Sequence, residues 1–106
     1  MQAVLKALAE PRRVAILTLL AGGEMRAGEI AERFDTTRPA ISEHLRVLVD
    51  ARLLVQRREG TRRIYAVRHE GFAELRAFLD RFWDDGLARL KAAAERESRE
   101  TLQHAE

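Results

Sequence analysis

Hydrophobic residues recur at helical spacing along the first third of the chain and predict three short helices. The first covers residues 3–10. Pro11 begins the second, because the fixed φ of proline and its missing N–H suit the first position of a helix, and Gly22 and Gly23 end it. The third covers about residues 27–34, with apolar residues on one side and charged residues on the other. The spacing therefore predicts a small domain made mainly of helices.

A fourth helix is predicted over residues 38–48. Thr37 can cap its N-terminus, and Pro39 lies in its first turn, where proline is tolerated. Successive residues of a helix point about 100° apart, so the apolar positions fall on one stripe, Ile41, Leu45 and Leu48. The helix therefore buries one face and presents a polar one, made of Pro39, Glu43, Arg46 and Asp50 with Ser42 at the flank.

After residue 53 hydrophobic and polar residues alternate, a spacing of two that indicates strands. Residues 54–58 and 63–67 are β-prone runs joined by the turn 59–62, whose Gly60 favours a tight hairpin. The arginines of this hairpin are expected to project outward or along its tip. The side chains expected to face the core are Ile64, Ala66 and Val55.

A single long helix is predicted from about residue 70 to 103. Its apolar side is marked by Phe72, Leu75, Leu79, Phe82, Trp83, Leu87, Leu90 and Ala94. A core built from short helices and a hairpin cannot bury so many large side chains, so a partner helix from an identical subunit should cover them. The alternative is that the helix folds back on its own core. The end, residues 98–106, is polar and is expected to fray, which leaves 1–97 as the folded domain.

The length of 106 residues fits one compact domain, and 46% hydrophobic residues are too many for a disordered segment. Cysteine is absent, which excludes disulfides, thiolate metal sites and cysteine nucleophiles. The longest apolar runs are far too short to cross a bilayer, and no signal-peptide pattern follows Met1. We therefore expect a cytoplasmic protein without membrane contact.

Positive charge is concentrated in the first two thirds of the chain. Residues 1–69 hold 13 Lys or Arg and 8 Asp or Glu, a net +5, whereas residues 70–106 hold 6 and 9, a net −3. Of the 19 basic residues 17 are arginine, which makes forked contacts with phosphate and guanine. The densest stretch, 52–68, has six arginines and one acid. Such a cluster indicates a polyanionic partner; a solvated arginine-rich surface is an alternative of comparable weight.

A helix–turn–helix followed by a basic hairpin is typical of proteins that bind double-stranded DNA, because an α-helix fits the major groove. Arg38 or Arg46 could contact guanine, and Glu43 could accept from cytosine. An ion pair with Arg46 is an equally good interpretation of Glu43. The hairpin arginines suit a phosphate backbone or a minor groove. The residues predicted to contact DNA are Thr37, Arg38, Pro39, Ser42, Glu43, Arg46, Arg57, Arg58, Arg62 and Arg63.

Linked motifs in the right order resemble the winged helix-turn-helix repressors of the ArsR type. Residues 7–13, Ala-Leu-Ala-Glu-Pro-Arg-Arg, and 27–31, Ala-Gly-Glu-Ile-Ala, look like the opening of that family. Residues 38–48, Arg-Pro-Ala-Ile-Ser-Glu-His-Leu-Arg-Val-Leu, are similar to its recognition-helix signature P-A-(V/I)-S-x-H-L-x-x-L. Residues 51–54 and 57–65 match its wing. The resemblance covers about residues 3–90.

This resemblance implies a homodimeric DNA-binding regulator, usually a repressor, that dimerises through its first and last helices. The residues expected at that interface are Leu5, Leu8, Phe78, Leu79, Phe82, Trp83, Leu87 and Leu90. Metal-sensing members carry a Cys-x-Cys pair on the third helix or paired Asp, His and Glu ligands on the last. The positions of His69, Asp84, Asp85 and His104 do not give that spacing, so we expect no metal and no cofactor. An effector is not identifiable, and His44 is interpreted as a packing or backbone-contacting residue.

The sequence also bears on three other functions: an enzyme, a protein-docking module and an RNA-binding protein. An enzyme is not expected, because the chain has no phosphate loop or nucleophile elbow, and the consecutive residues Ser42, Glu43 and His44 point too far apart to form a triad. A winged helix can also be a protein-docking module whose arginines bind an acidic partner. RNA is a weaker candidate, since the deep groove of its A-form helix excludes an α-helix. We predict a sequence-specific DNA-binding regulator, a homodimeric repressor at an inverted-repeat operator.

Overall fold

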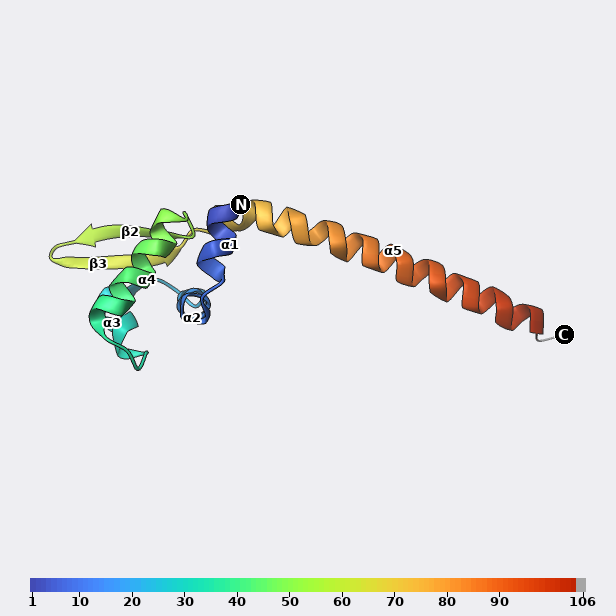
Figure 1. Ribbon diagram of the computed structural model, residues 1–106, viewed down its shortest axis with the longest axis horizontal. Coiled ribbons are helices and arrows are strands. Elements are labelled where there is room, and N and C mark those ends of the chain that lie inside the picture. Colours follow the sequence, from blue (N-terminus) through green and yellow to red (C-terminus); the bar gives the residue numbers. More distant parts are fainter. Residues whose placement is uncertain (105–106) are drawn as a thin grey trace. The chain divides into compact units, whose positions relative to one another are not determined.

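The computed structural model describes the backbone of residues 1–104 and the side-chain surroundings of residues 1–101. Two compact units are formed, Met1–Glu74 and the chain from Leu75 onward. The elements, labelled in Figure 1, are α1 (Gln2–Leu8), α2 (Pro11–Leu20), β1 (Met25–Arg26), α3 (Ala27–Glu32), α4 (Arg38–Asp50), β2 (Leu54–Glu59), β3 (Arg62–Val67), the 3-10 helix η1 (His69–Phe72) and α5 (Ala73–His104). The predicted class, mainly helical with a small hairpin, is confirmed.

The first two helices are joined by local hydrogen bonds. Pro11 occupies the first turn of α2, as predicted, and the carboxylate of Glu10 caps this helix by accepting the Arg12 N–H at 3.0 Å. The Arg13 guanidinium donates to the carbonyl oxygens of Ala7 at 2.7 Å and Lys6 at 3.1 Å. These carbonyls lie in the last turn of α1, where carbonyl groups lack the usual helical donor; that of Lys6 also accepts the Ala9 N–H at 3.3 Å. Arg13 of α2 therefore helps to satisfy the end of α1.

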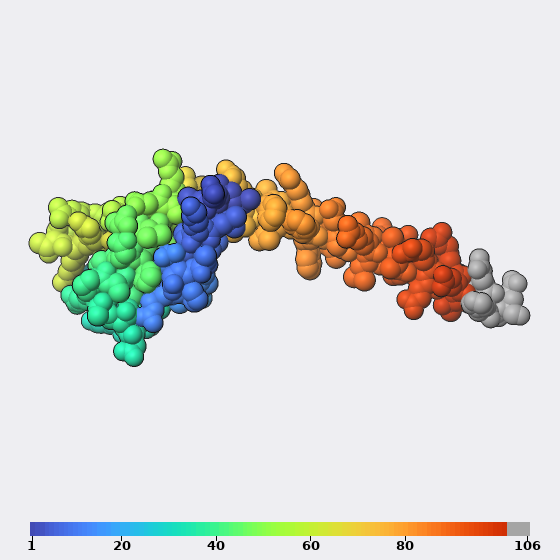
Figure 2. Space-filling model, in the orientation of Figure 1, coloured from blue at the N-terminus to red at the C-terminus, as the bar shows by residue number. Residues whose placement is uncertain are grey.

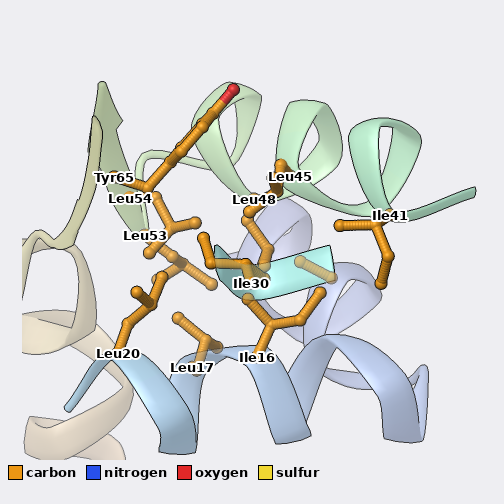
Figure 3. Close-up of a cluster of buried hydrophobic side chains, with 11 residues drawn as sticks. Ile16, Leu17, Leu20, Ile30, Ile41, Leu45, Leu48, Leu53, Leu54 and Tyr65 are labelled. Atoms are coloured by element: carbon orange, nitrogen blue, oxygen red, sulfur yellow. The ribbon is translucent and has the colours of Figure 1, made fainter. Parts of the chain in front are cut away.

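One apolar cluster forms the core of residues 1–74; in Figure 3 it lies between α4, in green at the top, and α2, in blue at the bottom, with the hairpin at the left. The predicted stripe of α4, Ile41, Leu45 and Leu48, is buried to 1% exposure or less, which confirms the assignment of its inner face. The rest of the cluster comes from α1, α2, α3, β2, β3 and the loop before β2: Ala7, Ile16, Leu17, Leu20, Ile30, Leu53, Leu54 and Tyr65.

The sheet has three antiparallel strands in the order β1-β3-β2. The hairpin turn is short, since Glu59 pairs directly with Arg62, and Gly60 has the positive φ of 65° that such turns require. The third strand, β1, was not predicted, because two residues are too few to give an alternating pattern. It pairs Met25 with Tyr65 and thereby fixes the start of α3 beside the hairpin.

The predicted inner face of the hairpin is wrong by one residue. Tyr65 and Leu54 face the core, at 6% and 2% exposure, whereas Val55 is 48% exposed and Ile64 and Ala66 are only half-buried. Neighbouring residues of a strand point to opposite faces, so a shift of one residue exchanges the two sets. The side chain of Tyr65 extends from the hairpin toward α4, as Figure 3 shows.

The long C-terminal helix is confirmed as α5, which follows η1 and ends at His104. Residues 98–104, expected as a frayed tail, are helical, and residues 105–106 of that segment lie outside the described range. Large apolar side chains line the helix in exposed positions, including Phe78, Leu79, Phe82, Trp83, Leu87 and Leu90. No helix within residues 1–104 combines the length and the apolarity needed to span a membrane.

Candidate nucleic-acid interface

The start of α4 presents polar side chains to solvent. The hydroxyl of Thr37 accepts the Ala40 N–H at 3.3 Å, so this residue caps the helix as predicted. Because the apolar stripe of α4 is fixed in the core and α3 packs against the helix, the opposite face points outward. The exposed residues on it are Arg38, Pro39, Ser42, Glu43 and Arg46.

Arg46 is held by two carboxylates of its own helix. Its Nε and Nη2 donate to Glu43 at 3.0 and 2.5 Å, and its Nη1 donates to Asp50 at 2.8 Å. The hydrogen bond from Arg46 lowers the pKa of Glu43, and Glu43 in turn raises the pKa of Arg46. Of the two interpretations of Glu43, the structure contains the ion pair. The role of Asp50 was missed, although its spacing of four residues from Arg46 signals such a pair.

Arg57, on β2, is bound in the same manner on the outer face of the sheet. Its guanidinium donates to both carboxylate oxygens of Glu24, with Nη2 to Oε1 at 2.9 Å, and to Glu59 at 3.3 Å. The hydrogen bond from Arg57 lowers the pKa of Glu24. Glu24 was missed because it lies 33 residues away and reaches Arg57 only through the pairing of β1 with β3.

The remaining hairpin arginines are exposed and gather at its tip. Arg58 lies directly opposite Arg63 on neighbouring strands, and Arg62 follows the turn. Among the described residues, no ion pair involves any of these three side chains or Arg38. The tip, in yellow-green at the left of Figure 2, protrudes from the surface of its unit. The structure therefore brings together three arginines there that have no ion pair among the described residues, whereas Arg57 is paired with Glu24 and Glu59.

His44 lies on α4 between the two faces. Its side chain is half-buried, and its buried Nδ1 has no hydrogen-bond partner in the described part of the chain. No group of three or more His, Asp or Glu side chains is placed to hold a metal ion within the residues that the structure describes.

Comparison with known proteins gives matches over the helix–turn–helix region and beyond it. The sequence profile described as "Bacterial regulatory protein, arsR family" matches residues 10–55. An HTH-type transcriptional regulator of Mycobacterium tuberculosis is 48% identical over 82 residues, which are 77% of this chain and 77% of that protein. The transcriptional repressor SdpR of Bacillus subtilis is 47% identical over 60 residues, 57% of this chain and 67% of the repressor.

A solved structure extends the match to three dimensions. It is the solution structure of the homodimeric winged helix-turn-helix DNA-binding domain of a possible ArsR-family transcriptional regulator from Mycobacterium bovis. The likeness has a TM-score of 0.64 at 38% identity and covers 79% of this chain and 78% of that one.

Proposed function

The chain belongs to the ArsR family of bacterial transcriptional regulators, and from this premise we propose that it represses transcription as a homodimer bound to an inverted-repeat operator. The observation that carries the proposal is the two-faced helix α4, whose apolar stripe is buried while Arg38, Ser42 and Arg46 are exposed. A helix anchored in this way can enter the major groove and bring its outward side chains to base edges. As a regulator of transcription, the protein is assigned to the cytoplasm, where the DNA is.

Sequence readout is assigned to the start and middle of α4. The N-terminal residues Thr37, Arg38 and Pro39 lie where a recognition helix approaches the bases, and Ser42 lies one turn further along. Thr37 also caps the helix, so its side chain has a structural role besides any contact with a phosphate. Arg38 carries no carboxylate partner in the described part of the chain, which leaves its guanidinium available to a base or a phosphate.

Affinity is assigned to the wing, the hairpin β2–β3. Arg58, Arg62 and Arg63 are exposed at its tip, and two arginines directly opposite each other repel unless an anion lies between them. A DNA phosphate is such an anion, and phosphate contacts supply most of the affinity that does not depend on sequence. Arg57 contributes less, since Glu24 and Glu59 already balance its charge.

Dimerisation is assigned to the first and last helices. Phe82 and Trp83 on α5 are 62% and 68% exposed, and Leu5 on α1 is 48% exposed, while Leu8 is half-buried. Large side chains exposed in this number mark an interaction surface. The interface is completed by Phe78, Leu79, Leu87 and Leu90. A twofold axis would place two copies of α4 in successive major grooves, about 34–36 Å apart.

The test is selection of bound fragments from a random-sequence duplex library by the full chain, at near-physiological salt with excess competitor DNA. Recovery of a common inverted repeat is expected. Recovery of fragments without a shared sequence, or of none, would contradict the proposal and favour a docking module, which binds an acidic protein and prefers no duplex.

A further inference from the structure

The ion pairs around Arg46 leave part of its guanidinium free. An arginine side chain has five N–H donors, and Arg46 uses three of them, two toward Glu43 and one toward Asp50. Two donors remain, one on Nη1 and one on Nη2. The edge of a guanidinium between Nη1 and Nη2 matches the O6 and N7 acceptors of guanine in the major groove, provided that Asp50 accepts the Nη1 hydrogen that faces Cδ. The carboxylates therefore fix the side chain without using up its capacity to contact a base.

Stabilisation of α4 explains the pair of Glu43 with Arg46, in which the acid precedes the base, but it explains the pair of Arg46 with Asp50 less well. Asp50 is the last residue of the helix, where the helix dipole disfavours a negative charge. Arg46 precedes Asp50 by four residues, and this order of charges is the less favourable one for such pairs. All three side chains are about 60% exposed, so solvent weakens the ion pairs further.

The charges of the cluster have a consequence for DNA binding. Two carboxylates surround one guanidinium, so this part of α4 carries a net negative charge and does not attract phosphate groups. A phosphate that contacts Arg46 must also approach Glu43 and Asp50. A base edge in the groove carries no formal charge, and it is penalised much less by those carboxylates. The cluster thus favours a base contact over a backbone contact for the same guanidinium.

We propose that Glu43 and Asp50 are specificity-determining positioning residues, which hold Arg46 away from DNA phosphates and present its two remaining donors to a guanine. This inference rests on the proposed DNA-binding function and names the residues that make one of its contacts selective. Glu43 itself then contacts no base, and its effect on DNA binding passes through Arg46.

The experiment measures binding of the full chain to a random-sequence 30-base-pair duplex between 50 and 200 mM salt. Glu43→Gln and Asp50→Asn each keep the size of the side chain and remove its charge. We expect both variants to bind random DNA several-fold more tightly than the parent. We also expect the slope of log K against log salt to steepen by about 0.9 per subunit, because the released Arg46 gains a phosphate contact. Glu100→Gln, an exposed carboxylate on α5, is the control for the change in net charge.

A double-mutant cycle separates this mechanism from a general electrostatic effect. In the Arg46→Ala background, Glu43→Gln should leave the salt slope unchanged, because no guanidinium remains to be released. On the duplex selected by the parent protein, Arg46→Ala should lose discrimination at one base pair, and Glu43→Gln should reduce it at the same one.

The outcomes are distinguishable. If the parent protein selects no sequence, the proposed function fails. If it selects a sequence but the two carboxylate variants bind random DNA no better than Glu100→Gln does, the inference is overturned while the function stands. An equal effect of Glu43→Gln with and without Arg46 would also overturn it.

Discussion

A Cβ atom added to Gly71 would lie 2.1 Å from the carbonyl oxygen of Arg52, a distance that no pair of unbonded atoms accepts. Gly71 belongs to η1, and Arg52 lies in the loop between α4 and β2, so two connections far apart in the sequence meet here. The same loop is bound by Arg68, whose N–H donates to the Leu53 carbonyl at 2.9 Å and whose Nη1 donates to that of Arg52 at 3.3 Å. The absence of a side chain at Gly71 permits this packing.

Gly71→Ala should therefore destabilise the protein, by about 1–3 kcal/mol, the usual cost of forcing extra atoms into a packed site. Gly86→Ala is the matched control, because nothing lies within 4 Å of that position in α5. Replacing a glycine inside a helix by alanine should raise stability by up to about 1 kcal/mol. Urea unfolding at one fixed protein concentration measures both changes. Effects of the same sign would show that the close approach to Arg52 is not what requires glycine.

Arg52 has a φ of 62°, in the left-handed region that residues other than glycine adopt at a cost. Arg52→Gly should raise the free energy of unfolding by about 1 kcal/mol, since glycine enters this region without a Cβ clash. Arg52→Ala removes the same side chain but keeps the Cβ, so it should give no such gain. If alanine stabilises as much as glycine, the arginine side chain and not the backbone conformation is the cause.

The helices were predictable because each one is long enough for its hydrophobic residues to recur several times at helical spacing. The stripe of α4 repeats three times within one helix, and its buried residues are the predicted ones. β1 has only two residues, too few for an alternating pattern of apolar and polar positions. Leu53 and Leu54 are both apolar at the start of β2, so the sequence does not show which face of the hairpin points to the core. That choice depends on tertiary packing. Tyr65, a large ring that fills the core, decided that register.

The candidate site divides in the same way. The contact of Glu43 with Arg46 was an open alternative in the sequence, because it is local to one helix. The contact of Arg57 with Glu24 could not be predicted, because it depends on the pairing of β1 with β3, which the sequence does not reveal. Grouping Arg57 with the other hairpin arginines followed from composition alone, which does not reveal that Glu24 lies beside Arg57.

Replacing Phe82 and Trp83 by serine should convert the protein to monomers. Both rings are more than half exposed on α5, and burial of such area between subunits supplies the free energy of association. Light scattering across a range of concentrations measures the mass. Arg81→Ser with Asp84→Ser is the control, because it changes the charged residues beside the same turns. A double variant at Phe82 and Trp83 with the mass of the parent would place the interface elsewhere.

Glu29 should give the protein part of its resistance to acid. Its carboxylate accepts Nε and the backbone N–H of Arg26 at 2.7 and 3.3 Å, and these bonds lower the pKa of Glu29, the side-chain bond most. A pKa lower in the folded state means that the stabilisation is present above the usual value of 4.5 and is lost as pH falls through the folded value. The stability difference between the parent and Glu29→Gln should therefore be largest near neutral pH and shrink toward pH 3.

Urea midpoints at several pH values measure that difference, and Glu32→Gln is the control on the same helix. The contribution of Glu29 is small, because the carboxylate is exposed and water screens it. If the stability difference between the parent and Glu29→Gln stays constant from neutral pH to pH 3, the contact with Arg26 does not depend on the charge of Glu29.

The wing arginines should differ in their effect on DNA binding although they lie on one hairpin. Arg63→Thr should flatten the salt dependence of binding to random duplex by about 0.9 per subunit, because one phosphate contact is lost. Arg57→Thr should change that slope less, since Glu24 and Glu59 already occupy its guanidinium. Threonine suits a strand, so neither change weakens the sheet through backbone preference.

Stability provides the independent check on this division. Arg63 lies directly opposite Arg58, and removing one of two facing like charges should leave stability unchanged or raise it by up to about 1 kcal/mol. Arg57→Thr removes the ion pairs that join Glu24 to the wing, and it should lower stability. Weaker DNA binding together with a fold at least as stable would show that Arg63 acts through the DNA. If the two variants instead lose binding and stability in parallel, the wing arginines do not divide into a phosphate-binding and a structural set.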